Sequence, residues 1–486
     1  MVISGLNLIK HLIRSPTGLT GVVILIFLLS LSVYGLLFVP ITAYSQWNNP
    51  LYWIDYPKTA APSWTNIGLG PKLFEHMILN ANVANITTDY IEGIRTISHR
   101  YSINIQSDSF PNDFMFTYSA KYNAIPPVIL INVLRPDGEK FDLYYSALPA
   151  SQGINNTYSG RIFSTDKIIK QNLAQYKTLV NWEVNFINPQ TMLFSELNKQ
   201  ELLKGDYHFS LTFFLFDNTS TIDNSGIILG GNTFGLMGTD DLRRDLAIGI
   251  ILGSPVALFI GLTVSTISVT IGLVYGVISG YRGKRTDESM MRVNDIFYAL
   301  PALPLLIILS ITFGRSIFLI AGFLIIFGWV GTAKIIRSLA LQIKTFQYVE
   351  AAKFMGQSDL RIIFKHIIPQ LLPLTFASMA IAVPAAILGE AALSFLGLGD
   401  PSIPTWGQIL HEANSADAAA RGIWWWILPP GLMIAVTGLA FYLIGNTLDS
   451  FANPLKNYFR RVRQRVLRLI FSSSKSRKQM YVISGY

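Results

Sequence analysis

Long apolar runs constrain this chain more than any other feature of its sequence. Apolar residues concentrate in the first 40 residues and again from about Leu246 to Ile444. A helix of about 20 such residues crosses the hydrocarbon core of a bilayer, because its rise is about 1.5 Å per residue. The whole chain is 51% apolar and only 14% charged, which is typical of membrane proteins. We therefore expect an α-helical membrane protein.

The runs predict six transmembrane helices. A basic start followed by an apolar run is also typical of a cleaved signal peptide. The residues from Phe38 onward do not form the small-residue cleavage site of a signal peptide, which favours an uncleaved helix. Small residues in the second helix favour close helix packing: Gly261, Ser265, Ser268, Gly272 and Gly276. The expected spans are Leu19–Val39, Val256–Ser279, two within Ile296–Thr332 separated at Gly314–Arg315, Leu374–Leu398 and Trp425–Ile444, with a polar turn over Gly280–Asp295.

Basic residues predict the orientation of these helices. The net charge of +9 could indicate a nucleic-acid partner, but the Lys and Arg residues gather in short segments beside the apolar runs, so we expect no nucleic acid. Segments 1–18, 280–295, 333–373 and 456–486 carry most of them, which predicts cytoplasmic termini at the cell membrane. The basic tail 456–486 has apolar residues at helical spacing, which is typical of a helix on an anionic leaflet; a solvated tail is the alternative.

The region between the first two apolar runs has the composition of a soluble domain. Short aromatic and β-branched runs predict strands at 114–118, 128–133, 141–145, 179–186 and 208–216. We expect a turn at Pro136–Gly138, a short helix over Asp166–Tyr176, and a tyrosine corner in which Tyr207 precedes a late strand. Together these predict an extracellular β-sandwich with an immunoglobulin-like topology. Three triplets in this region are candidate glycosylation sites: Asn85, Asn155 and Asn218.

A polar stretch, Glu350–Pro373, separates two apolar runs on the predicted cytoplasmic side. Good helix formers precede Gly356, Ser358 is placed to cap a second helix, and Pro369 and Pro373 are expected to end the segment. Two short helices at an angle would present a compact surface to a partner. The small pair Ala351–Ala352 would let that partner approach closely.

The chemistry that the sequence lacks is also informative. It has no GxxxxGK[ST] loop, no HExxH, no GxSxG and no cysteine, and its six histidines have no metal-ligand spacing. We therefore expect no enzyme active site, no metal site and no cofactor on this chain. Glu390, within an apolar run, is the one candidate for ion coupling, and we favour a structural or gating role for it over proton relay.

The polar stretch resembles the EAA loop of permease subunits in binding-protein-dependent ATP-binding-cassette (ABC) importers. Glu350, Ala351, Ala352, Gly356 and Pro369 fill that pattern, with His366 where the peptide branch commonly has histidine. Gly238–Asp245, Leu388–Gly399 and Pro404–Gly407 also resemble the dipeptide, oligopeptide and nickel permeases. This chain has Arg243 where that family usually has glycine. Ala61–Trp64 resembles the residues that normally stand just before the Gly238–Asp245 segment, and here about 170 residues separate the two, so the β domain is expected to be an insertion.

The resemblance implies a type I importer permease fold and a set of partners. These are a second permease subunit, two ATPase subunits that bind ATP and Mg, an extracellular solute-binding protein and the lipid membrane. It implies that the loop docks the ATPase, with Glu350–Gly356 in contact and Asp359–Pro369 fixing that contact to the next membrane helix. The residues expected in the coupling loop are Glu350, Ala351, Ala352, Lys353, Gly356, Asp359, His366 and Pro369; those expected in the translocation path or gate are Glu390, Ser394, Phe395 and Trp406.

The leading hypothesis is therefore a permease subunit of an ATP-driven importer of short peptides. Import of oligosaccharides by the same machinery, a membrane-anchored surface receptor and a proton-coupled carrier that uses Glu390 are the alternatives. The predicted organisation is an N-terminal segment with the first membrane helix (1–66), the β-rich insertion (67–233), the permease core (234–455) and the basic tail (456–486).

Overall fold

The computed structural model describes residues 12–68, 70–91, 93–123, 125–149, 157–179, 188–217 and 219–452. The sequons at Asn155 and Asn218, the basic tail and all but the first residue of the predicted strand 179–186 lie outside these ranges. The chain divides into two compact units. Among the described residues, the helical unit comprises 12–45, 248–415 and 427–452. The second unit, called the outer unit after its predicted location, comprises described residues within 46–247 and 416–426.

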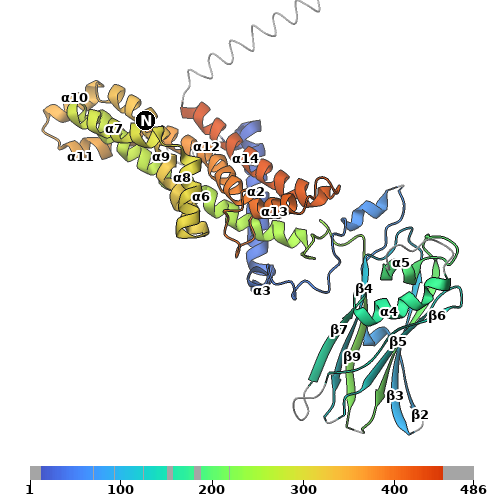
Figure 1. Ribbon diagram of the computed structural model, residues 1–486. Helices are drawn as coiled ribbons and strands as arrows, with labels where there is room; N and C mark the ends of the chain where they lie inside the picture. The colour runs from blue at the N-terminus through green and yellow to red at the C-terminus, as the bar shows by residue number, and fades with distance from the viewer. Residues whose placement is uncertain are drawn as a thin grey trace, which may run out of the picture. The chain divides into compact units, whose positions relative to one another are not determined.

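The helical unit is built from long apolar helices (Figure 1). Among the described residues, five helices are long and apolar enough to cross a membrane, or up to six if the bent pair α7 and α8 forms one span. The helices are α2 (Pro16–Phe38), α3 (Ile41–Ser45), α6 (Leu246–Arg282), α7 (Lys284–Ala299), α8 (Ala302–Phe313), α9 (Ile317–Ile343), α10 (Gln347–Phe354), α11 (Asp359–Ile362), α12 (Ile368–Phe395), α13 (Trp406–Ser415) and α14 (Trp424–Ala452).

The region 280–295 was predicted to be a polar turn, and this prediction is wrong. Gly283, at φ +64°, ends α6, and α7 begins at the next residue. Helix α7 is amphipathic and lies along α9: Asn294 donates to the Val330 carbonyl at 3.0 Å, and Arg337 pairs with Asp287 through two bonds of 2.5 Å. The bend of 76° between α7 and α8 falls beside Pro301, which has no N–H to continue the helix.

Small residues let α6 lie close to its neighbours, as predicted. A side-chain carbon on Gly272 would lie 2.9 Å from the Trp329 carbonyl of α9, and one on Gly276 would lie 2.5 Å from the Ala333 carbonyl. A carbon on Gly261 would meet Val383 of α12 at 2.8 Å. Close backbone approach of this kind replaces the hydrophobic driving force that lipid does not supply between helices.

The outer unit contains two antiparallel sheets that share one hydrophobic core (Figure 1). Within the described ranges, one sheet has the order β1-β9-β4-β7 and the other β2-β3-β8-β5-β6. The strands are β1 (Met77–Asn80), β2 (Asn85–Ile91), β3 (Ile94–Ile105), β4 (Asp113–Lys121), β5 (Val128–Leu134), β6 (Lys140–Ala147), β7 (Thr157–Phe163), β8 (Gly205–Leu215) and β9 (Thr221–Gly230), with short helices that include α4 (Lys167–Gln175) and α5 (Pro189–Phe194).

This strand order corrects the predicted immunoglobulin-like topology. We treat β2 as an extra edge strand. Each sheet then places strands from the beginning of the domain beside strands from its end: β1 pairs with β9, and β3 pairs with β8. That is the order of a jelly roll, in which two Greek keys wrap around one another. Immunoglobulin topology would instead place the first two strands side by side. The sequence signals for individual strands do not encode which strands pair, so this choice could not be read from them.

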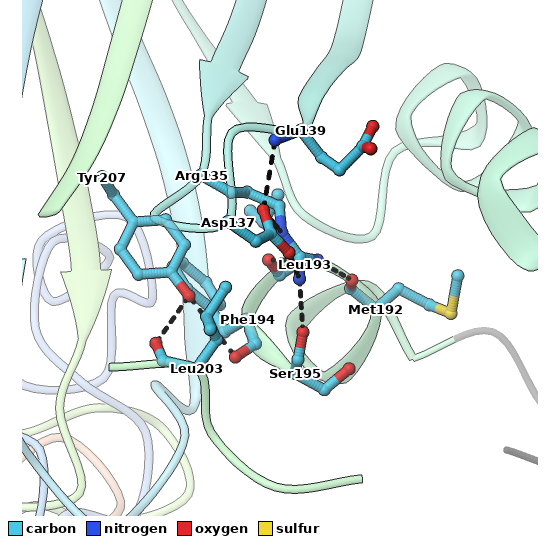
Figure 2. Close-up of polar contacts among 9 residues, drawn as sticks. All are labelled: Arg135, Asp137, Glu139, Met192, Leu193, Phe194, Ser195, Leu203 and Tyr207. Carbon is cyan, nitrogen blue, oxygen red and sulfur yellow. Dashed lines mark hydrogen bonds and ion pairs between the residues drawn. The ribbon is translucent and has the colours of Figure 1, made fainter. Parts of the chain in front are cut away.

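The predicted tyrosine corner is present despite the different topology (Figure 2). The Tyr207 hydroxyl donates to the Leu203 carbonyl at 2.8 Å, and burial raises the pKa of this phenol. Beside it, the buried Arg135 guanidinium donates to the Ser195 carbonyl at 2.6 Å and pairs with Asp137 at 2.7 Å. Arg135 also reaches the carbonyls of Met192 and Leu193 at 3.3 Å, so it satisfies acceptors that the end of α5 leaves without helical partners.

Candidate functional site

The predicted coupling loop forms two short helices joined by a tight turn. Gly356 ends α10 at φ +77°, a conformation that favours glycine. Its N–H donates to the Lys353 carbonyl at 3.0 Å, and the Gln357 N–H donates to the Ala352 carbonyl at 3.2 Å. This pair of bonds is the Schellman arrangement that terminates helices. The predicted break at Gly356 and the helix start at Asp359 are thus confirmed, whereas the Ser358 side chain makes no capping hydrogen bond among the described residues.

The two prolines do not end the segment, contrary to prediction. Residues 359–395 form one continuous helical stretch, in which a π-helical turn over Ile363–Ile367 leads into α12. Pro369 lies in the first turn of α12, and Pro373 lies inside it. The π turn already replaces the regular α-helical hydrogen bonds just before the prolines. Pro369, which has no N–H, therefore breaks no regular α-helical bond there. The membrane helix predicted to start at Leu374 therefore begins much earlier.

A hydrophobic cluster fixes the loop to two long helices. From the loop, Ile362, Ile363 and Ile367 are buried in it. From α6 and α9 come Leu273, Val277, Ile336, Ala340 and Ile343, and Val349, Ala352 and Leu371 complete the cluster. Polar contacts add to it, since the Tyr281 hydroxyl donates to Asp359 at 3.0 Å and His366 bonds with Gln357 at 3.0 Å. The loop is therefore packed directly against α6 and α9.

The face of the loop turned away from that cluster is exposed and partly apolar. Phe354 is 91% exposed and Met355 72%, and Leu360 and Phe364 are also exposed. Glu350, Ala351 and Lys353 are exposed on this face, whereas Ala352 is buried in the cluster. Side chains as large and apolar as Phe354 are rarely left in water without a partner when they gather in one patch.

A hollow of about 1020 Å³ adjoins the exposed face. Four basic side chains line it, against the carboxylates of Glu350 and Asp359. These basic residues are Arg282, Lys284, Lys344 and Lys353. The balance of charge suits an acidic group on an occupant. Sequence reasoning placed Arg282 and Lys284 in a turn and used them only for topology.

Of the predicted gate residues, Glu390 and Ser394 form one buried hydrogen-bonded pair, and Trp406 is buried separately against α6. Glu390 is 3% exposed and accepts a hydrogen bond of 2.6 Å from the Ser394 hydroxyl. Trp406, at the start of α13, is also buried and donates to the Ile250 carbonyl of α6 at 3.0 Å. Phe395 is exposed and lies outside this group. A side chain on Gly407 would meet Ala391 at 2.7 Å, so α13 lies directly against α12.

The charged segment Gly238–Asp245 is a dense set of ion pairs within the outer unit. The buried carboxylate of Asp240 holds Arg244 at 2.6 Å, and Arg244 stacks on the Trp47 ring. Asp241 pairs with Arg421 at 2.7 Å, and this guanidinium lowers the pKa of the Asp241 carboxyl. These contacts join three segments far apart in the chain. Sequence reasoning identified the segment but left its role open.

The remaining glycosylation candidate within the described ranges, Asn85, is exposed at the start of the edge strand β2. Its position permits modification. Among the described residues, no group of three or more His, Cys, Asp or Glu side chains is placed to hold a metal ion.

Comparison with known proteins gives consistent matches. Residues 272–458 match the family model of the binding-protein-dependent transport system inner membrane component. The chain is 37% identical over 218 residues to the oligopeptide transport system permease protein OppC of Bacillus subtilis, covering 45% of this chain and 70% of that protein. It is also 37% identical to the dipeptide transport system permease protein DppC of B. subtilis, with 45% and 68% covered, and to OppC of Haemophilus influenzae, with 45% and 69% covered.

Among solved structures, the inward-facing MetNI methionine ABC transporter is similar with a TM-score of 0.34 and 17% identity, over 41% of this chain and 96% of that chain.

Proposed function

The chain belongs to the family of binding-protein-dependent transport system inner membrane components, and we propose that it is the permease subunit of an ATP-driven importer of short peptides. Its relatives named for oligopeptide and dipeptide transport support peptides as cargo. Its apolar helices are those of a multi-pass membrane protein. The sequence contains no phosphate-binding loop of the P-loop type, so the energy for transport comes from another chain.

The coupling surface is the exposed face of α10, Gly356 and α11. The surface is fixed to α6 and α9 through the cluster around Ile362 and Ile363, and its outer side presents Phe354 and Met355 to a partner. In this proposal the coupling loop, Glu350–Pro369, docks on an ATPase subunit. Closure of the two ATPases on ATP and Mg then moves α6 and α9 as rigid elements, which produces alternating access.

The assembly contains a second permease subunit, two ATPase subunits and an extracellular solute-binding protein. The fold we propose is that of a type I importer permease with six spans, in which α7 and α8 form one bent span. Both termini face the cytoplasm, because the basic residues gather in the segments on that side. The β-rich region 67–233 is then an extracellular insertion placed to meet the binding protein.

The gate in this proposal includes Glu390, Ser394, Phe395 and Trp406. Glu390 acts structurally, because it accepts the Ser394 hydroxyl within the last turns of α12 and so satisfies both buried side chains. Trp406 ties α13 to the α6 backbone. Movement of α6 is therefore passed to the segment that follows α12.

Two substitutions on exposed side chains test the coupling surface. Glu350→Lys reverses a charge at the rim of the basic hollow, and Phe354→Asp places a charge where we expect an apolar contact. Both should leave folding intact because these side chains are exposed. In proteoliposomes with the partner subunits, each should lower peptide uptake at least tenfold and weaken ATPase binding, since a charge without a partner at an interface costs about 2–5 kcal/mol.

Glu139→Lys, an exposed charge reversal in the outer unit, is the matched control and should transport normally. Normal uptake by Glu350→Lys and Phe354→Asp would contradict the coupling role.

A further inference from the structure

A polar hollow of about 260 Å³ lies on the outward face of the sheet β1-β9-β4-β7. Along β4, Phe114, Phe116 and Ala120 face the core of the outer unit. Thr117 and Ser119 lie on the opposite face and line the hollow. The coupling loop and the gate contribute nothing to this hollow, and no step of transport has been assigned to it.

A glycine of β9 lies between two of the residues that line the hollow. Gly226 of β9 pairs with Asn80 on one side and Thr117 on the other. A side-chain carbon at Gly226 would lie 2.8 Å from the Thr117 hydroxyl and 3.6 Å from the Asn80 side-chain oxygen. Any larger residue would therefore fill the space between these two polar groups. Glycine at position 226 keeps the space between Asn80 and Thr117 open.

The lining offers hydrogen bonds that the protein does not use. Among the described residues, the side chains of Asn80, Asn224 and Thr117 make no hydrogen bond. The two asparagine amides and the threonine hydroxyl can all both donate and accept. At one side, Arg161 and Asp55 form a two-bond pair of 3.1 and 3.0 Å and remain about 40% exposed. Because their charges cancel, the lining is neutral overall while it presents donors and acceptors side by side.

These features favour one class of ligand. Strands β9 and β4 are paired on both sides, so their backbone groups are already used and cannot bind a peptide as an added strand. Neutrality disfavours an anion or a cation. The planar side chains of Asn80, Asn224 and the Asp55–Arg161 pair can each contact two neighbouring hydroxyl groups, and Ile78, which is 49% exposed, offers an apolar contact.

We propose that this hollow binds a neutral sugar unit of an oligosaccharide. Its volume is below the roughly 300–1,000 Å³ of pockets for drug-sized molecules, which fits one ring at a time. The inference stands on the chemistry of the outer unit and does not depend on which cargo the permease carries.

The test is titration calorimetry of the full-length protein in a detergent without a sugar head group. Maltotriose, cellotriose and chitotriose are the neutral probes, and trialanine is the peptide probe. At least one trisaccharide should bind saturably. Asn224→Ala and Thr117→Val should each weaken that binding by about three- to tenfold, the effect of one lost hydrogen bond. Thr88→Val, an exposed position on the other sheet, should leave it unchanged.

Absence of binding for all three trisaccharides would overturn the proposal, as would sugar binding that Asn224→Ala and Thr117→Val both leave intact. Trialanine binding that is lost in Asn224→Ala without any sugar binding would also overturn it, in favour of a peptide site. A thermal melt of each variant at the wild-type midpoint shows that loss of binding is not loss of folding.

Discussion

Arg243 adopts a left-handed backbone conformation, at φ +68°, and from it the guanidinium pairs with Asp113 at the start of β4. The same side chain donates to the Tyr56 carbonyl at 2.7 Å. A residue with a side chain is strained in this conformation, and glycine is not. The conformation at Arg243 thus costs conformational free energy, and in it the side chain links the charged segment Gly238–Asp245 to the β-sheet of the outer unit.

This relationship predicts an order among variants at one position. Arg243→Ala loses the ion pair and keeps the backbone strain, whereas Arg243→Gly loses the pair and relieves the strain. Arg243→Gly should therefore be more stable than Arg243→Ala by about 1–2 kcal/mol, and both should be less stable than the wild type. Thermal unfolding of the purified protein measures the difference. Equal midpoints for the two variants would show that the conformation carries no strain.

Gly356→Ala should damage coupling through the backbone alone. The substitution forces a side chain into the conformation at φ +77° and weakens the end of α10 by about 1–2 kcal/mol. We expect a several-fold lower ratio of peptide taken up to ATP hydrolysed in proteoliposomes. Gly314→Ala is the matched control, because Gly314 has φ +92° and open space around it between α8 and α9. If both variants lower the ratio equally, the effect is general strain.

Arg135→Met should strongly destabilise the outer unit. It leaves Asp137 without its cation and leaves the carbonyls at the end of α5 without a donor (Figure 2). Breaking a buried pair from one side costs about 3–5 kcal/mol. Limited proteolysis should show earlier cleavage in the outer unit. Lys140→Met removes an exposed cation 4.0 Å from Asp142 and should change the cleavage rate little.

The outer unit should lose stability as the solution becomes acidic. His99 is buried beside Ser225, with 2.6 Å between its Nδ1 and the hydroxyl, and burial lowers the pKa of this imidazole from 6.5. Burial also lowers the pKa of His76. Between these lowered pKa values and the unfolded-state pKa of about 6.5, the unfolded chain binds more protons than the folded chain. The free energy of unfolding therefore has its full value above about pH 7 and falls as the pH drops through 6.5.

The melting temperature should therefore be lower at pH 5 than at pH 7.5, and His99→Asn should reduce that difference. His208→Asn, at an exposed position on β8, should leave the difference at its wild-type size. A melting temperature independent of pH in the wild type would contradict this account.

Glu390→Gln separates a structural role from proton relay. In the wild type the Ser394 hydroxyl donates to the Glu390 carboxyl group at 2.6 Å. Glutamine keeps an oxygen that can accept this bond, but it cannot take up or release a proton. Uptake should stay within about twofold of the wild type. Glu390→Leu leaves Ser394 without its acceptor in a buried site and should lower uptake further, since an unsatisfied buried group costs about 1–3 kcal/mol. Complete loss of uptake in Glu390→Gln would favour proton relay.

Hydropathy identified the long apolar helices well, because a bilayer demands uninterrupted apolar length. The expected first span, Leu19–Val39, closely matches α2. Helix α7 was missed because its polar residues were assigned to a turn, although its apolar positions recur at helical spacing. In the outer unit β9 was missed because Asp223, Asn224 and Gly226 are turn-forming residue types, and here neighbouring strands on both sides override that preference.

The candidate site was predictable in its chemistry and less so in its arrangement. The EAA pattern located α10, Gly356 and the start of α11, since the conformation at Gly356 is tied to its residue type. The burial of Ala352, and the basic hollow that adjoins Glu350, depend on how α6 and α9 pack against the loop. No local pattern contains that information. For the same reason Asp287 and Arg337, which are far apart in sequence, could not be paired in advance.

The chain enters and leaves the β-rich region at one place. The Ala61 N–H donates to the Asn232 carbonyl and the Phe234 N–H to the Ala61 carbonyl, both at 2.7 Å, and the Ser63 N–H donates to the Gly235 carbonyl. A segment bounded in this way can be acquired, exchanged or deleted in a single genetic event, because its two ends already lie beside one another. The same point is an insertion site at which protein engineers can replace the β-rich region with a different domain, such as a fluorescent reporter.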